Sequence, residues 1–296
     1  MNILHIWDQA GVACILAKYQ RRSGHKVKIM KRSGYDPFGF FNFYNESLVS
    51  SDNDEFLKLC IKDAQKYEVI HVHSIFHIVP KLRERYPSKK LILHYHGSEV
   101  RSKKTIFKNV RLNKTLTHFV RSFEKYYYEK QNITTTTELR LKAENNSDHV
   151  LISTPDLKNY IANNKVKYVP NPVDIEHFTK VDILSDRSIM INTHLTDIEW
   201  ALDYLANNNF ELPIEIHDRV SSPIPYSEIP KFLIQYGIYI DIRYINGVLL
   251  ANLSKTALEA LACGLKVLTY DLRYIEELPE VNRPESVVNR LLNLYR

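Results

Sequence analysis

Two groups of residues in this 296-residue chain have types and spacings that could support chemistry. The first consists of two His-x-His pairs, which are His71 with His73 and His94 with His96. Each pair lies at the end of a predicted strand, where alternate residues point to the same face. Each could therefore present two imidazoles to one metal ion, so one alternative is a metal-dependent hydrolase. No carboxylate follows either pair at the spacing of a further ligand, which argues against this alternative.

The second group lies where a predicted helix begins. Ser254 is a favourable N-cap, and Lys255 and Thr256 follow in the first turn. The free amides, the positive end of the helix dipole and the lysine together suit a phosphate. Glu259 lies one turn further in, where its carboxylate could accept two hydroxyl protons from a ribose. A solvated helix with an ordinary cap, ended by Gly264, is the alternative interpretation.

Composition indicates a soluble globular protein of about two domains. Hydrophobic residues make up 44% of the chain, yet no run approaches the roughly 18 apolar residues that span a bilayer. The N-terminus enters a strand pattern at once, unlike a signal peptide. The three cysteines, Cys14, Cys60 and Cys263, are widely spaced in apolar patterns, which predicts buried thiols and a cytoplasmic location. The net charge of +6 favours anionic partners.

Strand and helix patterns alternate along almost the whole chain, which predicts an α/β fold with parallel sheets and helices on both faces. Pro170 and Pro172 exclude helix and central strand, so residues 170–174 are predicted to be an interdomain linker. The threonines at 134–137 are predicted to form a loop. The predicted strands are 3–7, 27–30, 69–72, 91–95, 149–153, 166–169, 189–192, 214–217, 239–242 and 266–270. The predicted helices are 12–23, 55–67, 156–163, 198–205, 229–236, 255–262 and 284–295.

An aromatic segment interrupts this alternation at residues 34–44. It holds Phe38, Phe40 and Phe41 between glycine and proline turns. One interpretation is an acceptor platform, because aromatic faces suit sugars and lipid chains. The other is a loop folded onto the core by its own rings. The sequence leaves both open.

A basic, amphipathic segment is predicted at residues 101–130, with nine Lys or Arg residues against two Glu. Such a surface suits an anionic membrane face, with association on the cytoplasmic side, or a polyprenyl-phosphate acceptor. A solvated helix packed on the rest of the protein is the alternative. Nothing shows the base-stacking modules of a dedicated nucleic-acid binder.

Residues 258–268, Leu-Glu-Ala-Leu-Ala-Cys-Gly-Leu-Lys-Val-Leu, resemble the C-terminal signature of the retaining family-four glycosyltransferases, which have the two-domain GT-B fold. The strand ends at residues 72–74 and 95–99 and the linker at 170–174 resemble the same family. Its signature has two glutamates separated by seven residues. Glu259 matches the second, which holds the donor ribose, whereas Ala251 stands at the first.

The resemblance implies two Rossmann-like domains facing across a cleft. Residues 1–172, joined by a C-terminal helix at 284–296, would form the acceptor side, and residues 173–283 would bind the nucleotide sugar. His96 would contribute to catalysis beside the reacting sugar, with Gly97 and Glu99 on the acceptor side. The loop containing Gly11 would face the cleft near the donor.

The resemblance also implies a reaction, in which a hexosyltransferase moves a sugar from a nucleotide-sugar donor to a glycan, lipid or other acceptor. Transfer would retain the anomeric configuration and need no metal or other cofactor. Residues 193–197 lack the permanent cations that the family places there. Lys255, Arg219 and Arg243 are therefore predicted to neutralise the diphosphate. A degenerate, non-catalytic GT-B protein that binds a nucleotide or glycan as a partner subunit is the alternative.

Overall fold

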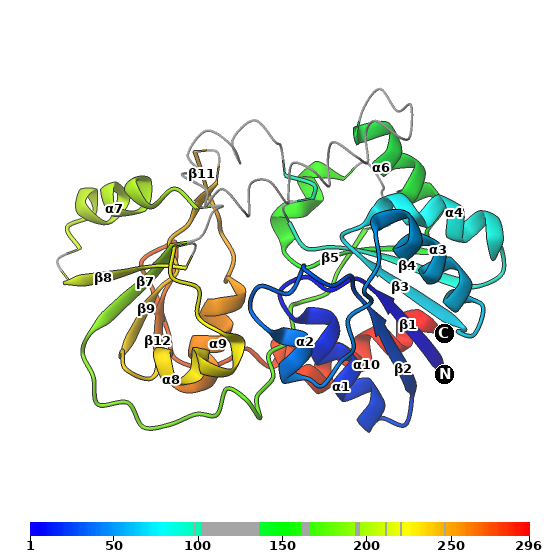
Figure 1. Cartoon of the computed structure of the whole chain (residues 1–296). Helices are drawn as coiled ribbons and strands as arrows, with labels where there is room; N and C mark the ends of the chain where they lie inside the picture. Colours follow the sequence, from blue (N-terminus) through cyan, green and yellow to red (C-terminus); the bar gives the residue numbers. More distant parts are fainter. Residues whose placement is uncertain are drawn as a thin grey trace.

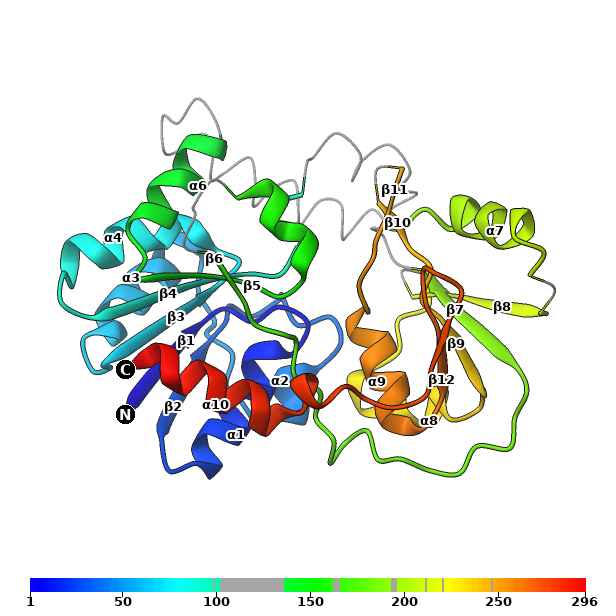
Figure 2. The same cartoon turned by 180° about the vertical axis from the view of Figure 1, so that it is seen from behind.

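The computed structural model describes residues 1–97, 99–101, 136–161, 166–192, 196–210, 212–219, 221–245 and 247–296. These residues form two largely parallel sheets, each covered by helices (Figure 1). A segment at residues 170–174 connects the first sheet to the second, and the last helix returns to the first (Figure 2). The predicted α/β class with parallel sheets is therefore confirmed.

The first sheet has six parallel strands in the order β2-β1-β3-β4-β5-β6. Its central strands are buried on both faces, although histidines interrupt their apolar residues. The strands are β1 (Asn2–Ile6), β2 (Lys26–Met30), β3 (Val69–His73), β4 (Lys90–Tyr95), β5 (His149–Ile152) and β6 (Val166–Tyr168).

Alternate residues of these strands face two different helix layers. Ile3, with its neighbours on one face, packs against α1 (Val12–Arg22) and the returning α10 (Pro284–Tyr295). Leu4, on the opposite face, belongs to the core formed with the other helices. Those helices are α3 (Asn53–Ala64), α4 (Val79–Arg85, preceded by the 3-10 turn Phe76–Ile78) and α6 (Thr136–Asn145).

The second sheet has the order β13-β12-β9-β7-β8, in which only β13 is antiparallel to its neighbour. Helix α7 covers one face, and α8 and α9 cover the other. The strands are β7 (Ser188–Asn192), β8 (Ile214–Asp218), β9 (Ile238–Ile240), β12 (Lys266–Leu268) and β13 (Tyr274–Ile275). The helices are α7 (Ile198–Asn207), α8 (Ile229–Leu233) and α9 (Lys255–Cys263), and a hairpin joins β10 (Tyr244–Ile245) to β11 (Val248–Leu249).

A single apolar core crosses between the two halves. Cys14 of α1 and the short helix α2 (Phe40–Phe43) from the first half contribute to it. Tyr226, in the 3-10 turn Tyr226–Glu228, contributes from the second half together with α8 and α9. Removal of this apolar surface from water holds the halves together.

Several local predictions are wrong. Residues 156–163 were expected to form a helix, but Pro155–Tyr160 is a 3-10 turn, and Thr136 begins α6 where a loop was expected. Helices α2 and α4, the β10–β11 hairpin and β13 were not predicted. Residues 102–130, which are all of the predicted basic helix except Arg101, lie outside the described residues.

The three cysteines are buried free thiols, as predicted. Among the described residues, no helix is both long enough and apolar enough to cross a membrane.

Candidate functional site

The chain turns sharply where β1, β3 and β4 end. Trp7, Ser74 and Gly97 follow these strands with positive φ angles of 73°, 59° and 144°. Such backbone conformations cluster at functional sites, and open parallel sheets bind ligands at the carboxyl ends of their strands. The carboxyl edge of the first sheet is therefore a candidate functional site.

A carboxylate organises the turn after β4. Glu99 accepts hydrogen bonds from the backbone amides of His96 and Gly97, the latter at 2.9 Å, and from Ser74 Oγ at 3.0 Å. A Cβ on Gly97 would lie 2.2 Å from a nitrogen of Arg101, so only glycine fits there. Glu99 thus holds the turn, and three of the roughly four acceptor positions of its carboxylate are used by these donors.

The imidazole of His96 points into the protein. It belongs to a closed circle of eight hydrogen-bonded side chains, hereafter the histidine ring. The others are His5, Gln20, His71, His73, His94, Ser153 and Tyr295. The bonds are Tyr295 Oη–His71 Nδ1 (2.6 Å), His71 Nε2–His94 Nδ1 (3.2 Å), His94 Nε2–Ser153 Oγ (3.2 Å), Ser153 Oγ–His96 Nδ1 (2.7 Å), His96 Nε2–His73 Nδ1 (3.0 Å), His73 Nε2–His5 Nδ1 (2.9 Å), His5 Nε2–Gln20 Oε1 (2.8 Å) and Gln20 Nε2–Tyr295 Oη (3.3 Å).

Burial keeps these histidines neutral. It lowers the pKa of His5 to about 4, although the hydrogen bond that His5 donates to Gln20 opposes the shift. Burial also lowers the pKa values of His71, His73 and His94, and neighbouring imidazoles add to the effect. For His96, burial lowers the pKa against the opposing charge of Glu99. The site therefore contains uncharged imidazoles at neutral pH.

The histidines do not fit a hydrolytic metal centre, the first alternative from the sequence. Two sets, His5 with His71 and His73, and His73 with His94 and His96, have ligand atoms within 4.8 Å of one another. However, every ring nitrogen of these five residues already has a hydrogen-bond partner in the histidine ring. A divalent ion would replace several of these bonds and bring a charge that no carboxylate in the ring balances. A catalytic site also needs an open coordination position, which this buried cluster does not offer.

The predicted role of Gly11 in donor binding is not supported by its contacts. Its amide donates to Asp8 Oδ2 at 3.0 Å, and the other oxygen of this buried carboxylate accepts from the amide of Ala13 at 2.8 Å. The positive end of α1 is therefore already occupied. A Cβ on Gly11 would lie 2.4 Å from the Phe40 ring, so the glycine instead allows α2 to approach the start of α1 closely within the first half.

The start of α9 has the predicted form. Ser254 is the N-cap and accepts from the amide of Ala257 at 2.9 Å, and Gly264 ends the helix with φ 101°. Lys255 Nζ donates to Glu259 Oε1 at 2.7 Å, and both side chains are largely buried. Thr256 is buried in the first turn. This turn thus presents a lysine–glutamate pair.

Arg243, which was predicted to neutralise the diphosphate, instead binds groups within the protein. Its Nε donates to Asp241 Oδ1 at 2.8 Å, and its Nη2 donates to the carbonyl of Asn252. Asp241 Oδ2 also accepts from the amide of Ser254 at 2.7 Å. Arg243 and Asp241 therefore fix the loop that leads into α9, and the charge of this arginine is already balanced.

Arg219, directly after β8, differs from Arg243 in its contacts. Its guanidinium lies 4.2 Å from the centre of the Phe38 ring, across the boundary between the halves. Its Nε is buried and has no hydrogen-bond partner within the described part of the chain. Burial lowers the pKa of Arg219, and the negative charge of Glu259 opposes that shift. A buried cation with an unsatisfied donor near α9 is what an anion site requires.

Two of the three phenylalanines predicted to form an acceptor platform lie in the core. Phe40 and Phe41 are buried in the interdomain core, and Phe40 packs against Tyr226 with ring centroids 4.3 Å apart. The alternative interpretation, a loop folded onto the core by its rings, is confirmed for these two residues. Phe38 is only partly buried, and it contacts Arg219.

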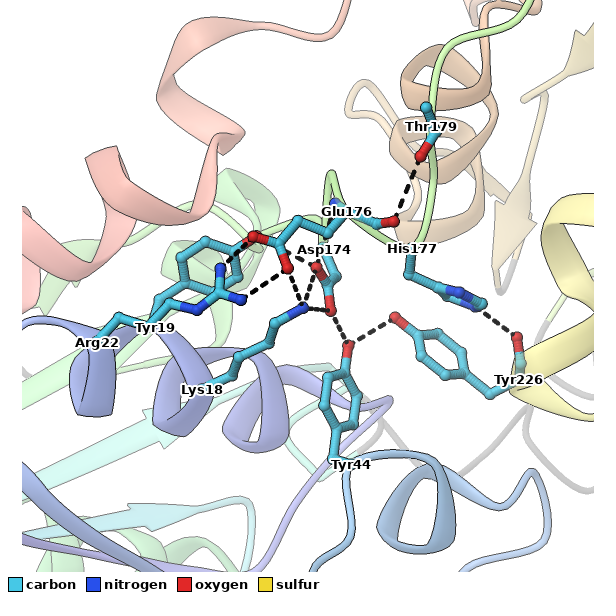
Figure 3. Close-up of polar contacts among 9 residues, drawn as sticks. All are labelled: Lys18, Tyr19, Arg22, Tyr44, Asp174, Glu176, His177, Thr179 and Tyr226. Carbon is cyan, nitrogen blue, oxygen red and sulfur yellow. Dashed lines mark hydrogen bonds and ion pairs between the residues drawn. The ribbon is translucent and has the colours of Figure 1, made fainter.

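Sequence reasoning missed the polar network at the linker (Figure 3). Asp174 is fully buried and accepts from Lys18 Nζ at 2.8 and 2.7 Å and from Tyr44 Oη at 2.9 Å. Tyr44 Oη in turn lies 3.0 Å from Tyr226 Oη in the second half. Asp174 therefore joins α1, α2 and the second half at one point. Its partners are 130 and 156 positions away, so no local sequence pattern could identify them.

A family model described as Glycosyltransferase Family 4 matches residues 10–177, which is more than half of the chain. The protein therefore belongs to glycosyltransferase family 4. Its two α/β units with parallel sheets, joined by a linker and by the returning α10, form a GT-B fold.

Solved structures similar to this chain include other glycosyltransferases. Spinosyn forosaminyltransferase SpnP is 12% identical, with 100% of this chain and 90% of that chain covered and a TM-score of 0.44. Spinosyn rhamnosyltransferase SpnG complexed with thymidine diphosphate is 10% identical, with 99% of this chain and 91% of that chain covered and a TM-score of 0.43. Os79 from O. sativa in complex with UDP and deoxynivalenol-3-glucoside is 11% identical, with 98% of this chain and 84% of that chain covered and a TM-score of 0.45. No curated protein matches the chain.

Proposed function

We propose that this glycosyltransferase moves a hexose from a nucleotide-sugar donor to a glycan, lipid or other acceptor, with retention and without a metal. The domain limits that we propose are 1–172 with 284–296 on the acceptor side and 173–283 on the donor side. The observation that carries the proposal is Arg219 at the carboxyl edge of the second sheet, whose buried Nε has no hydrogen-bond partner among the described residues and whose charge interacts with that of Glu259. Family membership supports the transfer of a sugar.

The donor diphosphate would bind between Arg219 and the first turn of α9. Its charge would satisfy the unpaired Nε of Arg219, and the helix start and Lys255 would add further positive potential. These groups are held in place before the reaction, so they could stabilise the charge that develops as the diphosphate leaves. In this proposal Arg219 and Lys255 replace the cations that residues 193–197 lack.

Glu259 would hold the ribose. Lys255 binds its Oε1, so a ribose hydroxyl would bind through Oε2. The lysine fixes the orientation of the carboxylate and leaves Oε2 to accept from the ribose. We therefore propose that the lysine–glutamate pair links recognition of the phosphate with recognition of the ribose.

On the acceptor side we propose that the main chain of the His96–Gly97 turn faces the sugar. Both nitrogens of the His96 imidazole bind Ser153 and His73, so the ring cannot polarise a substrate while those bonds persist. His96 thus becomes a positioning residue in this account. Glu99, which binds the two amides of the turn, has the same role.

The proposed membrane contact through residues 101–130 rests on the sequence alone. Arg101, the described member of this segment, pairs with Asp156 at 2.8 Å and is mostly buried, so it does not belong to an exposed basic surface. Residues 102–130 lie outside the described part of the chain. Flotation with anionic and neutral vesicles tests this contact: binding to both alike, or to neither, would contradict it.

Calorimetric titration with nucleoside diphosphates in the presence of a chelator tests the donor site. We expect one base to bind selectively, and Arg219→Met to weaken that binding at least about tenfold, as expected when a charged hydrogen bond is lost. Arg187→Met is the matched control, because Arg187 is half exposed and pairs only with the exposed Glu215 among the described residues. Equal affinities of the two variants would contradict the proposed site.

A further inference from the structure

The histidine ring links the candidate site to the far end of the chain. His5, His71, His73 and His94 come from three adjacent strands, β1, β3 and β4, and share one face of the first sheet. Ser153 and His96 follow directly after β5 and β4. The ring closes through Gln20 of α1 and Tyr295 near the C-terminal end of α10, the two helices that cover this face.

The orientation of Gln20 sets the direction of every hydrogen bond in this ring. Its Oε1 can only accept, so His5 Nε2 donates, and the unprotonated Nδ1 of His5 accepts from His73 Nε2. By the same reasoning His73 Nδ1 accepts from His96 Nε2, and His96 Nδ1 accepts from the Ser153 hydroxyl.

The other half of the ring follows in the same direction. The carbonyl oxygen of Tyr95 lies 3.2 Å from Ser153 Oγ and is a second acceptor for the same proton. With the Ser153 proton directed at His96, its oxygen accepts from His94 Nε2, and His94 Nδ1 accepts from His71 Nε2. His71 Nδ1 then accepts from the Tyr295 hydroxyl, whose oxygen accepts from Gln20 Nε2. All donors and acceptors match, with five neutral histidines that each carry the proton on Nε2. Only a reversal of the whole ring matches equally well, with all five protons on Nδ1.

This arrangement ties the protonation state of His96 to its neighbours. A second proton on His96 would turn Nδ1 into a donor facing the Ser153 hydroxyl, so that hydroxyl would have to turn from His96 to the carbonyl of Tyr95, its other acceptor. The charged groups that act on His96 are Glu99 and Asp8, both of which favour its protonated form. On His5, Arg21 opposes protonation and Asp8 favours it. The bonds of the ring thus oppose the effect of Glu99 and Asp8 on His96.

We propose that Ser153 and His73 are positioning residues for sugar transfer, which hold the His96–Gly97 turn through a one-directional ring of hydrogen bonds that closes at Tyr295. This inference rests on the proposed function, because it assigns the turn to the acceptor side of that site. The ring fixes one imidazole tautomer, and the tautomer fixes the position of the main chain that meets the sugar.

Long-range nitrogen–proton NMR correlation spectra of the wild-type protein at pH 7.5 test the ring itself. They show which nitrogen of each imidazole carries the proton. We expect His5, His71, His73, His94 and His96 to be neutral and to carry the proton on the same ring nitrogen, which is Nε2 for the Gln20 orientation seen here. A mixture of tautomers among the five, or a cationic imidazole, would overturn the proposal.

Kinetics of the variants test the positioning role. Ser153→Ala should lower kcat about tenfold, the effect of one lost hydrogen bond to the turn, with the donor KM within about twofold of wild type. In this variant the acid limb of the pH profile of kcat should also shift to higher pH, by about one unit, because His96 Nδ1 becomes free to bind a proton. Tyr295→Phe, which opens the ring on α10 rather than at the turn, should shift the acid limb in the same direction.

Matched controls separate this role from a general loss of stability. Ser147→Ala and Tyr86→Phe remove hydroxyl groups that bond backbone carbonyls of the same half, Ala143 and Ile61, outside the ring. If the ring variants change kcat and its pH profile no more than these controls, the positioning role is overturned. A wild-type protein that transfers no sugar would overturn the proposed function and the positioning role with it, whereas the NMR result would still decide whether the ring exists.

Discussion

Acid should destabilise this protein steeply, because six of its histidines are buried in neutral form. They are His5, His71, His73, His77, His94 and His96. Burial lowers the pKa of each in the folded state, to about 4 for His5 and about 3 for His77. Between these values and about 6.5 the unfolded chain binds more protons than the folded one. The stabilisation is therefore fully present above pH 6.5 and is lost as the pH falls.

The size of the effect follows from proton linkage. Between pH 7.5 and 5.5 a histidine that is neutral when folded and has a pKa of about 6.5 when unfolded changes the unfolding free energy by about 1.4 kcal/mol. The five residues with the most strongly lowered pKa values, which are all except His96, together give about 7 kcal/mol. This is comparable with the whole stability of a typical domain. Burial raises the pKa of Asp241, which opposes the trend at more acidic pH.

Urea unfolding at constant ionic strength, followed by tryptophan fluorescence at pH 7.5, 6.5 and 5.5, measures this slope. Near pH 5.5 we expect the unfolding free energy to fall by roughly 7 kcal/mol per pH unit, which corresponds to the binding of about five protons on unfolding. A slope near 1.4 kcal/mol per pH unit means that only one proton binds. That result would refute the neutral, buried histidine ring.

The remaining predictions concern single residues. Glu259→Ala should raise the donor KM more than it lowers kcat, because the contact with the ribose is lost equally in the bound donor and in the transition state. A fall in kcat with unchanged KM in steady-state kinetics would contradict this. Asp174→Asn should lower the unfolding free energy by about 2 kcal/mol, because a buried acceptor of Lys18 and Tyr44 loses its charge. Urea unfolding measures this change, and an unchanged midpoint would speak against the linker network. Gly97→Ala should cost stability, since the new Cβ meets Arg101 at positive φ; calorimetry should show a lower Tm, and an unchanged Tm would be inconsistent with that contact.

Local patterns were enough to predict most of the fold. Buried parallel strands are rich in apolar residues, and helix ends have caps, so α9 begins after Ser254 and ends at Gly264 as expected. Helix α4 was missed because it is short and begins next to a proline. Helix α2 was missed because its phenylalanines become buried only against the second half of the chain.

The site could be predicted only in part, because much of it depends on distant residues. His-x-His spacing placed two pairs at neighbouring strand ends, but the ring also needs Gln20 and Tyr295, which are 275 positions apart. Arg219 and Arg243 both follow strands of the second sheet, and only their partners distinguish them. Asp241, two residues before Arg243, is the local signal that could have marked that arginine as structural.

The most direct test of the proposed function is transfer itself. Purified protein would be incubated with single nucleotide sugars and a panel of glycan and lipid acceptors, in chelator, and the product examined by proton NMR. We expect one donor to give a product with the same anomeric configuration as the donor, at a rate that the chelator leaves unchanged. An inverted product, transfer that needs added metal, or nucleotide binding without any transfer would contradict the account.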